Sequence, residues 1–167
     1  AIVDRINHSI LNYVKNELNT EIYEIEANFY TNESHFFPNN TEKPSARSSN
    51  RFKLLTADFY EINKFKQALK KRKTICIVPM VLHLCKNSRI MLLKNIDVSS
   101  GLVNGARGTI KSLLEKNGKI STLMIQFDGR NDLVPIIKCR VHSYVLISGK
   151  EIYAWQFPLK LCYCVTS

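Results

Sequence analysis

The sequence predicts an α+β fold, in which two helices and a strand precede a small antiparallel β-barrel. Three observations support this prediction. Apolar residues recur at helical spacing over residues 2–18 and again over residues 59–69. Residues 22–30 alternate between apolar and polar side chains, as a half-buried strand does. Residues 85–155 contain short β-rich segments joined by tight turns, a pattern typical of small barrels.

The first helix is expected over residues 2–18, with one apolar stripe and a polar remainder. The stripe consists of Ile2, Ile6, Ile10, Val14 and Leu18. In the strand at residues 22–30, the apolar face consists of Tyr23, Ile25, Ala27 and Phe29. The intervening side chains, two glutamates and an asparagine, fall on the other face, which we expect to be solvated.

Residues 31–50 lose this periodicity and are rich in Asn, Ser, Thr and Pro, which predicts a long surface loop. A second helix begins near Thr56 or Asp58, because Asp58 and Glu61 have the spacing of a capping box. Its apolar stripe consists of Phe59, Ile62, Phe65 and Leu69. The basic run at residues 70–73 suits the negative end of a helix as well as it suits a phosphate contact.

A β-hairpin is predicted around Asn117-Gly118, which lies between the β-rich segments 110–114 and 120–125. Asn-Gly is the pair that two-residue hairpin turns favour, since both central residues need positive φ. Asp-Gly and Ser-Gly pairs further along indicate two more turns. These turns divide the second half of the chain into the short strands of the predicted barrel.

Charge is the first indication of function. The chain carries 24 Lys and Arg against 14 Asp and Glu, a net charge of +10, and its pI is near 9.5. Such a charge attracts polyanions, of which nucleic acid is the commonest, although a basic protein need not bind any. The longest apolar run, residues 75–84, is too short for a bilayer span, so no membrane partner is expected.

We expect the cysteines to be free thiols in a reducing, intracellular compartment. They are Cys76, Cys85, Cys139, Cys162 and Cys164, an odd number with no C-x-x-C pair. No secretory signal opens the sequence, which favours the same setting. Cys139 and His142 are a loose zinc candidate that lacks two further ligands, so no metal site is assigned.

The sequence contains no constellation for catalysis. It has no G-x-x-x-x-G-K-[ST] loop to cradle a nucleotide phosphate, and no G-x-S-x-G or H-E-x-x-H. The four histidines are scattered, and no spacing pairs a nucleophile with a base. No catalytic residue is therefore assigned.

One stretch of the sequence indicates a protein family much more specifically than the composition does. Residues 88–110 read S-R-I-M-L-L-K-N-I-D-V-S-S-G-L-V-N-G-A-R-G-T-I. This closely resembles a segment of the Pif-one family of superfamily-one DNA helicases, whose pattern is roughly G-A-x-V-M-L-x-K-N-x-x-x-x-x-G-L-x-N-G-x-R-G. The matching positions are Met91, Leu92, Lys94, Asn95, Gly101, Leu102, Asn104, Gly105, Arg107 and Gly108. The departure is at Asn87-Ser88, where the family usually has Gly-Ala.

Two flanking runs match the family in the same order. Residues 3–7, V-D-R-I-N, resemble the V-D-x-I-N that follows the fourth helicase motif. Residues 156–166 resemble Q-x-P-L-x-L-A-Y-A-x-T, which in the family leads into the fifth motif, H-K-S-Q-G. Because the sequence stops at Ser167, the resemblance implies a fragment whose ATP-binding motifs are encoded elsewhere.

The resemblance also implies an organisation and partners. Residues 1–84 would be part of a second RecA-like domain, residues 85–155 an inserted SH3-like β-barrel, and residues 156–167 a return to the RecA-like domain that stops before the fifth motif. Family members couple ATP hydrolysis, with Mg²⁺, to 5′-to-3′ movement on single-stranded DNA; this chain itself would hold no cofactor. The implied partners are single-stranded DNA, bound without sequence preference, and the remainder of the helicase. The implied setting is first the nucleus, with mitochondrial and viral settings as alternatives.

The nucleic-acid-binding candidates lie in and beside the matched segment. They are Lys94, Asn95, Asn104, Arg107 and Lys111. Arg107 either reaches a phosphate or a base, or bonds a carbonyl of the barrel. Asn104 either contacts nucleic acid or only shapes a turn, as Gly105 does. The residues assigned to structural turns are Gly101, Gly105, Gly108, Asn117 and Gly118.

Three functions stay open at the level of sequence. The first is a DNA-engaging part of an ATP-dependent helicase that is inert as a motor by itself. The second is a stand-alone nucleic-acid-binding module whose affinity falls steeply with salt. The third is a truncated helicase relic without activity.

Overall fold

The computed structural model describes residues 2–32, 54–71 and 78–163, which form a mixed α/β fold with few helices and mostly antiparallel sheets. In chain order its elements are α1 (Ile2–Leu18), β1 (Tyr23–Glu26), β2 (Asn28–Asn32), β3 (Leu54–Thr56), α2 (Phe59–Lys71), β4 (Val81–Leu84), β5 (Arg89–Leu92), β6 (Arg107–Lys116), β7 (Lys119–Phe127), β8 (Val134–Ile137), β9 (Cys139–Val145), β10 (Glu151–Gln156) and β11 (Leu159–Leu161). The strands pair as β1-β4, as β3-β2-β10-β9 and as β11-β5-β6-β7-β8. No helix in these ranges is long and apolar enough to cross a membrane.

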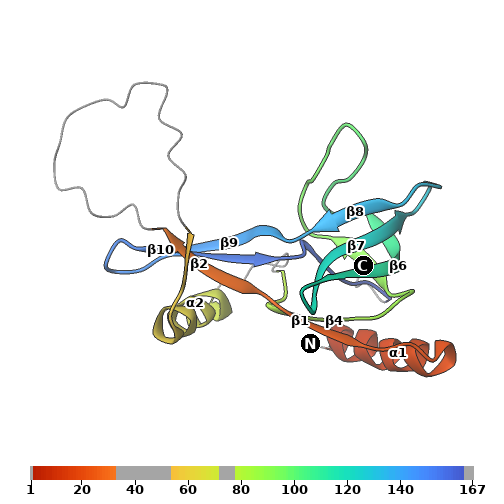
Figure 1. Ribbon diagram of the computed structural model, residues 1–167, viewed down its shortest axis with the longest axis horizontal. Coiled ribbons are helices and arrows are strands. Elements are labelled where there is room, and N and C mark those ends of the chain that lie inside the picture. Colours follow the sequence, from red (N-terminus) through yellow and green to blue (C-terminus); the bar gives the residue numbers. More distant parts are fainter. Residues whose placement is uncertain (1, 33–53, 72–77, 164–167) are drawn as a thin grey trace.

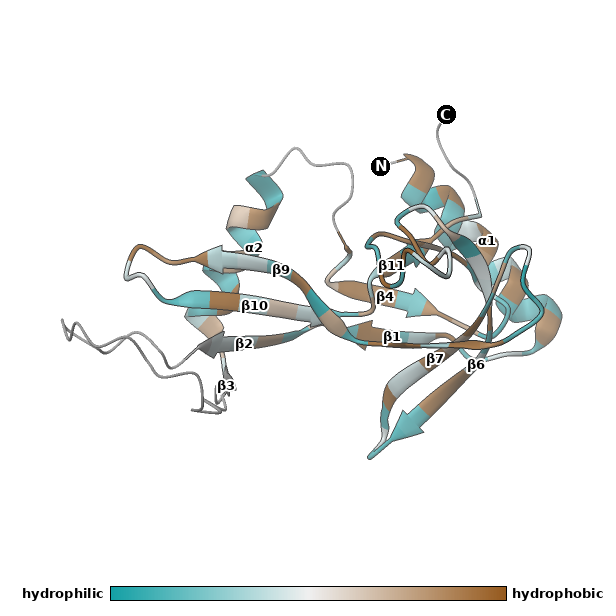
Figure 2. Cartoon of the chain, turned by 90° about the horizontal axis from the view of Figure 1, so that it is seen from above, coloured by the Kyte–Doolittle hydropathy of each residue, from teal (hydrophilic) through white to brown (hydrophobic). Residues whose placement is uncertain are grey.

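The molecule is elongated, with one helix near each end (Figure 1). α2 lies beside the four-stranded sheet, and α1 lies beside β1 and β4 near the five-stranded sheet. Seen from above, β1 continues into β2, so that one extended segment connects the two ends (Figure 2). The buried side chains fall into two clusters that match these ends, a larger one around the five-stranded sheet and a smaller one under α2.

α1 covers residues 2–18 as predicted, but its buried face coincides with the predicted stripe only in part. Leu11, which lies outside the stripe, is 1% exposed. Within the stripe Ile10 and Val14 are half-buried, whereas Ile2 and Ile6 are 67% and 40% exposed. The reason is geometric, since each step of four residues overshoots a helical turn by about 40° and the stripe winds around the helix. The buried Asn7 fixes the helix to the strand end instead, because its Oδ1 accepts a hydrogen bond from Tyr163 N at 3.0 Å.

The predicted strand at residues 22–30 forms, but it is shared between two sheets. β1 pairs with β4, and β2 pairs with both β3 and β10. The chain changes sheets at Ala27, whose N donates to Met80 O at 2.7 Å. Ile25 and Ala27 are buried while the glutamates between and beside them are exposed, which is the predicted alternation.

α2 begins with the predicted capping box. Glu61 N donates to Asp58 Oδ1 at 2.8 Å, and Asp58 N donates to Glu61 Oε2 at 3.0 Å. Phe65 and Leu69 pack against the four-stranded sheet and are nearly inaccessible. Phe59 was predicted to share their stripe, but it is 81% exposed, because it lies six positions before Phe65 and therefore about 120° away around the helix.

β6 and β7 form the predicted hairpin, and Asn117 and Gly118 form its turn with φ of 53° and 70°. The inward side chains of this pair are fully buried; they include Ile110, Leu123 and Ile125. No sheet formed by the described residues closes on itself, so the SH3-like barrel stays a prediction. β11 pairs with β5, and β9 and β10 share a sheet with β2, so hydrogen bonds join segments across the predicted boundaries at residues 84 and 155.

The cysteines that the structure describes are free thiols. Cys85 and Cys162 are buried, and Cys139 is half-buried with a thiol pKa that burial raises. His142 Nε2 accepts a hydrogen bond from Val78 N at 3.1 Å, and no metal-binding group of side chains gathers within the described ranges. The predicted loop at residues 31–50 is wrong at its start, because residues 31 and 32 belong to β2. Its remainder, residues 33–50, lies outside those ranges, as do Cys76, Cys164 and residues 72–73 of the basic run.

Candidate nucleic-acid interface

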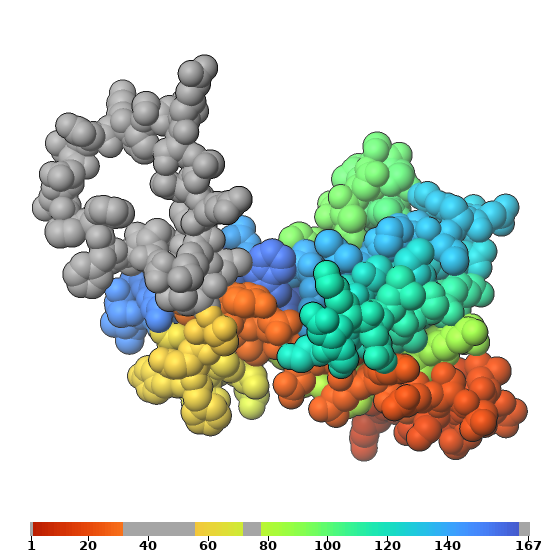
Figure 3. Space-filling view, viewed as in Figure 1, coloured from red at the N-terminus to blue at the C-terminus, as the bar shows by residue number. Residues whose placement is uncertain are grey.

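The loop of residues 93–106 joins β5 to β6 and projects from the five-stranded sheet (green in Figure 3). Two backbone hydrogen bonds close its base, from Leu92 N to Ala106 O and from Gly105 N to Leu92 O, both 2.8 Å long. Gly101 and Gly105 have φ of 77° and 94°, a region that side chains disfavour, so these two glycines permit the bends of the loop.

Lys94, Asn95 and Asn104 are exposed on this loop, and all three take part in holding it. Asn104 N donates to Asn95 Oδ1 at 2.8 Å, which joins the two arms of the loop. Lys94 Nζ donates to the carbonyl oxygen of Arg140 at 2.9 Å, which ties the loop to β9. The structure therefore brings these three candidates together and gives each a structural contact.

Arg107 begins β6 and is exposed in a cross-strand row. It stands opposite Met91 of β5, and Met91 stands opposite Lys160 of β11. Directly opposed residues of antiparallel strands point to the same face, so Lys160, Met91 and Arg107 form one outward-facing row. We call these three residues the cationic row. The inward neighbours Ile90 and Leu161 are buried, which agrees with this assignment.

Lys160 was absent from the sequence-based candidates. Its position between Leu159 and Leu161, both buried, was the signal that marked it as outward-facing on a strand. What the sequence withheld was the pairing of β11 with β5, which puts Lys160 beside a segment far from it along the chain.

Lys111 lies apart from the cationic row, and Gly108 is not in the turn to which it was assigned. Lys111 is half-buried at a bulge in β6, where the pairing with β7 shifts between Ile110 and Ser112, and it is four residues along the strand from Arg107. Gly108 is not in a turn but inside β6, paired with Ile90 and Phe127. The turn assignment was wrong for Gly108 because the bend ends before β6 begins.

Two further arginines, Arg89 and Arg130, hold the structure around the cationic row through hydrogen bonds and ion pairs. Arg89 donates to both carboxylate oxygens of Asp128 at 2.7 Å and to Thr109 Oγ1 at 3.0 Å. The hydrogen bonds from Arg89 lower the pKa of Asp128, with a smaller contribution from the charge of Arg107. Arg130 donates to Asp132 and to the carbonyl oxygen of Ser100 at 2.7 Å, which ties the projecting loop to the turn after β7.

Asp97 holds the outer part of the loop together. Its Oδ1 accepts hydrogen bonds from Ser99 Oγ at 2.6 Å and from Ser99 N at 3.1 Å, and its backbone bridges to Leu102. Hydrogen bonds from the hydroxyls of Ser100 and Ser99 lower the pKa of Asp97 to about 2.

The Asp97 carboxylate should titrate at an unusually low pH. Because its pKa is lowered, the charged form favours the native loop above the ordinary value of 3.8, and this stabilisation disappears as pH falls through about 2. NMR titration should therefore give a midpoint near 2. Replacing both serines, S99A together with S100A, should move the midpoint toward 3.8. A midpoint near 3.8 in the unmodified chain would contradict the hydrogen bonding described above.

A narrow apolar slot of about 230 Å³ lies beside Lys94 and Asn95. Its other walls are Ile96, Pro135, Ile136, Ile137, Cys139 and Pro158. Ile96 and Ile137 are 45% and 64% exposed, so apolar surface lies open next to the polar loop residues. Apolar and polar contacts are thus available side by side at this end of the five-stranded sheet.

Comparisons with known proteins identify relatives of this arrangement. Residues 65–113, which run from the middle of α2 into β6, match the family model described as DNA helicase Pif1, 2B domain. A curated relative, ATP-dependent DNA helicase PIF1 of Xenopus laevis, is 31% identical over an alignment of 101 residues that covers 54% of this chain and 14% of the relative. The chain therefore spans about a seventh of this relative's length.

Solved structures of Pif1 helicases share the fold over nearly the whole chain. The crystal structure of Pif1 from Candida albicans has a TM-score of 0.61 and 17% identity, covering 98% of this chain and 33% of that one. Unliganded Pif1 from Bacteroides sp has a TM-score of 0.53 and 18% identity, covering 96% and 37%. Bacteroides Pif1 bound to ssDNA has a TM-score of 0.50 and 16% identity, covering 96% and 28%. These structures show the shared fold, and the family-model match, which includes residues 88–110, confirms the resemblance read from that segment.

Proposed function

We propose that this chain, a Pif1-like helicase fragment in sequence and in fold, contributes single-stranded DNA engagement to its parent helicase through the cationic row. The observation that carries the proposal is the register Lys160–Met91–Arg107 across β11, β5 and β6. Neighbouring residues of such a row are about 5 Å apart, so two cations flank one flexible apolar side chain on one surface. A relative of similar fold has been solved with ssDNA bound, which supports the choice of partner.

Each part of the row has a chemical task in this proposal. The guanidinium of Arg107 and the ammonium of Lys160 would contact successive backbone phosphates. Met91, which is half-buried, would contact a sugar or a base between them. Phosphate contacts carry no sequence information, so binding would be non-specific. The loop residues Lys94, Asn95 and Asn104 extend the same surface.

The finer domain assignment belongs to the same proposal. We infer that residues 85–155, which supply β5, β6, β7 and β8 of the five-stranded sheet, correspond to an SH3-like insertion. Residues 1–84 and 156–167 would belong to a second RecA-like domain, and β11 of the returning segment completes the sheet. ATP and Mg²⁺ would act in the parent helicase outside this chain, and the residues of this chain would bind and orient the strand. The antiparallel order β11-β5-β6-β7-β8 supports the assignment to an SH3-like insertion, and so does the bulge in β6, because bulges bend strands as a small barrel requires.

R107Q and K160Q should each weaken binding of a labelled oligo-dT and flatten its salt dependence. Removing one cation that neutralises a phosphate of a single strand should reduce the slope of log K against log salt by about 0.7. Fluorescence anisotropy of the 167-residue chain between ~50 and ~200 mM salt measures both quantities.

K116Q is the matched control, since Lys116 is exposed at the opposite end of β6 and its replacement removes the same charge. K116Q should change the affinity for oligo-dT and its salt dependence much less than R107Q or K160Q does. If K116Q and R107Q have equal effects, binding follows net charge alone and the cationic row is not the interface.

A further inference from the structure

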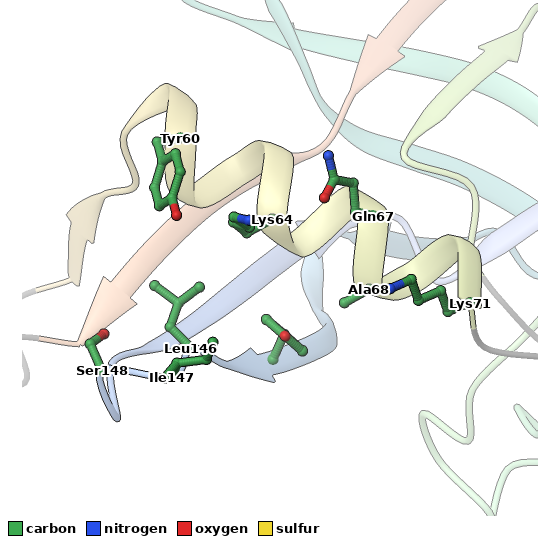
Figure 4. A pocket seen from close by; sticks show the side chains of 9 residues that line it. Tyr60, Lys64, Gln67, Ala68, Lys71, Leu146, Ile147 and Ser148 are labelled. Atoms are coloured by element: carbon green, nitrogen blue, oxygen red, sulfur yellow. The ribbon is translucent and has the colours of Figure 1, made fainter.

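A groove of about 540 Å³ lies between α2 and the turn that joins β9 to β10 (Figure 4). Its helical wall consists of Tyr60 and the residues four, seven, eight and eleven positions after it, which share one face of α2. They are Tyr60, Lys64, Gln67, Ala68 and Lys71. The opposite wall consists of Tyr144, Leu146, Ile147 and Ser148.

This face of α2 is separate from the face that packs in the core. Phe65 and Leu69 bury the neighbouring face against the four-stranded sheet. Tyr60 is 65% exposed and Ile147 is fully exposed, so the rim of the groove presents an aromatic ring and an aliphatic side chain to solvent. Large apolar side chains gathered at one hollow indicate a binding surface more often than scattered single ones do.

The charges of the groove are complementary to an anion. Lys64 and Lys71 line it, and none of the described residues that line it carries a carboxylate. The nearest acidic side chain on the helix, Glu61, is neutralised by an ion pair with Lys150. Lys64 Nζ lies 5.4 Å from the centre of the Tyr60 ring, so a cation and an aromatic face stand together at the rim.

We propose that this groove is a second contact for single-stranded nucleic acid, in which a base stacks on Tyr60 and the adjoining phosphates contact Lys64 and Lys71. Aromatic platforms beside backbone-tracking cations are how proteins hold single strands without reading their sequence. A groove of several hundred Å³ accommodates a nucleotide. The proposal takes its partner from the proposed function, but it uses a surface at the other end of the molecule from the five-stranded sheet (Figure 1).

The test pairs each groove variant with a neighbour on the same helix. Y60A and K64Q should each weaken oligo-dT binding to the full chain by about five-fold, the change expected for one stacked base or one charged contact. F59A removes an exposed aromatic residue next to Tyr60, and K70Q removes an exposed lysine that does not line the groove, so both should bind within about two-fold of the unmodified chain. Circular dichroism checks that all four variants fold.

Photocrosslinking supplies an independent measurement. An oligonucleotide carrying 5-iododeoxyuridine should crosslink to the peptide that contains Tyr60 or to the one that contains Tyr144. Crosslinks confined to other peptides, or equal effects of Y60A and F59A, would contradict nucleic-acid binding in this groove. The same two results are expected if the groove instead binds an acidic or an apolar peptide.

The outcomes also separate this proposal from the proposed function. Weakening by R107Q but not by Y60A would leave the cationic row as an interface and remove the groove. Weakening by Y60A but not by R107Q would do the reverse. Absence of measurable binding by the unmodified chain at ~50 mM salt would overturn both.

Discussion

Q156L should lower the free energy of unfolding by about 3 kcal/mol, since a buried backbone group left without a partner costs about 1–3 kcal/mol. Gln156 is fully buried, and its Nε2 donates to the carbonyl oxygens of Ile25 at 2.9 Å and Met80 at 3.2 Å. Its Oε1 accepts a hydrogen bond from Phe157 N at 3.0 Å. Leucine has a similar volume but no polar atoms, so the substitution would remove hydrogen bonds rather than packing.

Urea denaturation followed by circular dichroism measures this change. Q67L, the same substitution at an exposed position of α2, should stay within about 0.5 kcal/mol of the unmodified chain. If the two variants unfold at the same urea concentration, the side-chain amide of Gln156 does not join the segments that we describe. A changed dependence on urea in Q156L alone would instead indicate that one part of the molecule unfolds separately.

The position of Gln156 shows what the sequence predicts and what it withholds. Its match to the family pattern marked it as part of a recognisable run, yet its hydrogen-bond partners lie 131 and 76 residues away along the chain. By contrast, the hairpin turn at Asn117 and the capping box at Asp58 were predictable, because both depend on residues within three positions of one another. Local chemistry can be read from sequence, whereas the pairing of distant segments cannot.

The buried faces of the helices were predictable only in part, unlike the local turn and cap, which were predictable, and the pairing of distant segments, which was not. The sequence located α1 and α2 well, but it assigned Ile2 and Phe59 to buried stripes, and both are exposed. A stripe of apolar residues shows that a helix has an apolar face, but the neighbouring sheet decides which part of it is covered. In α1 the covered part centres on Leu11 and the polar Asn7, which periodicity of apolar residues could not reveal.

Some residues of the candidate interface could be predicted from the sequence, and others could not. Lys94, Asn95, Asn104 and Arg107 were found together because one continuous segment carries them, and the structure keeps them at one loop and strand start. Lys160 was missed because only the β11–β5 pairing brings it to that surface. The α2 groove had no sequence signal beyond a basic run, since its second wall comes from the β9–β10 turn.

G108A should destabilise the fold by about 3 kcal/mol, at the upper end of what overpacking a single site costs. A Cβ atom at Gly108 would lie 2.8 Å from the carbonyl oxygen of Gln126 and 2.8 Å from Ile125 Cγ2. One of these atoms belongs to the backbone of the paired strand β7, so neither a rotamer change nor a small shift of one side chain relieves the overlap. The glycine therefore permits β6 and β7 to approach closely directly after the cationic row.

G118A separates this effect from backbone strain. Gly118 has φ of 70° and open space around a Cβ atom, so alanine there meets a conformational penalty alone, of about 1 kcal/mol. Chemical denaturation of the two variants should therefore rank G108A as clearly less stable than G118A. Because Gly108 follows Arg107, G108A should also weaken oligo-dT binding more than G118A does under conditions where both remain folded. Equal stability of the two variants would mean that β6 and β7 can separate at Gly108, and the register that aligns Lys160, Met91 and Arg107 would then lack its support.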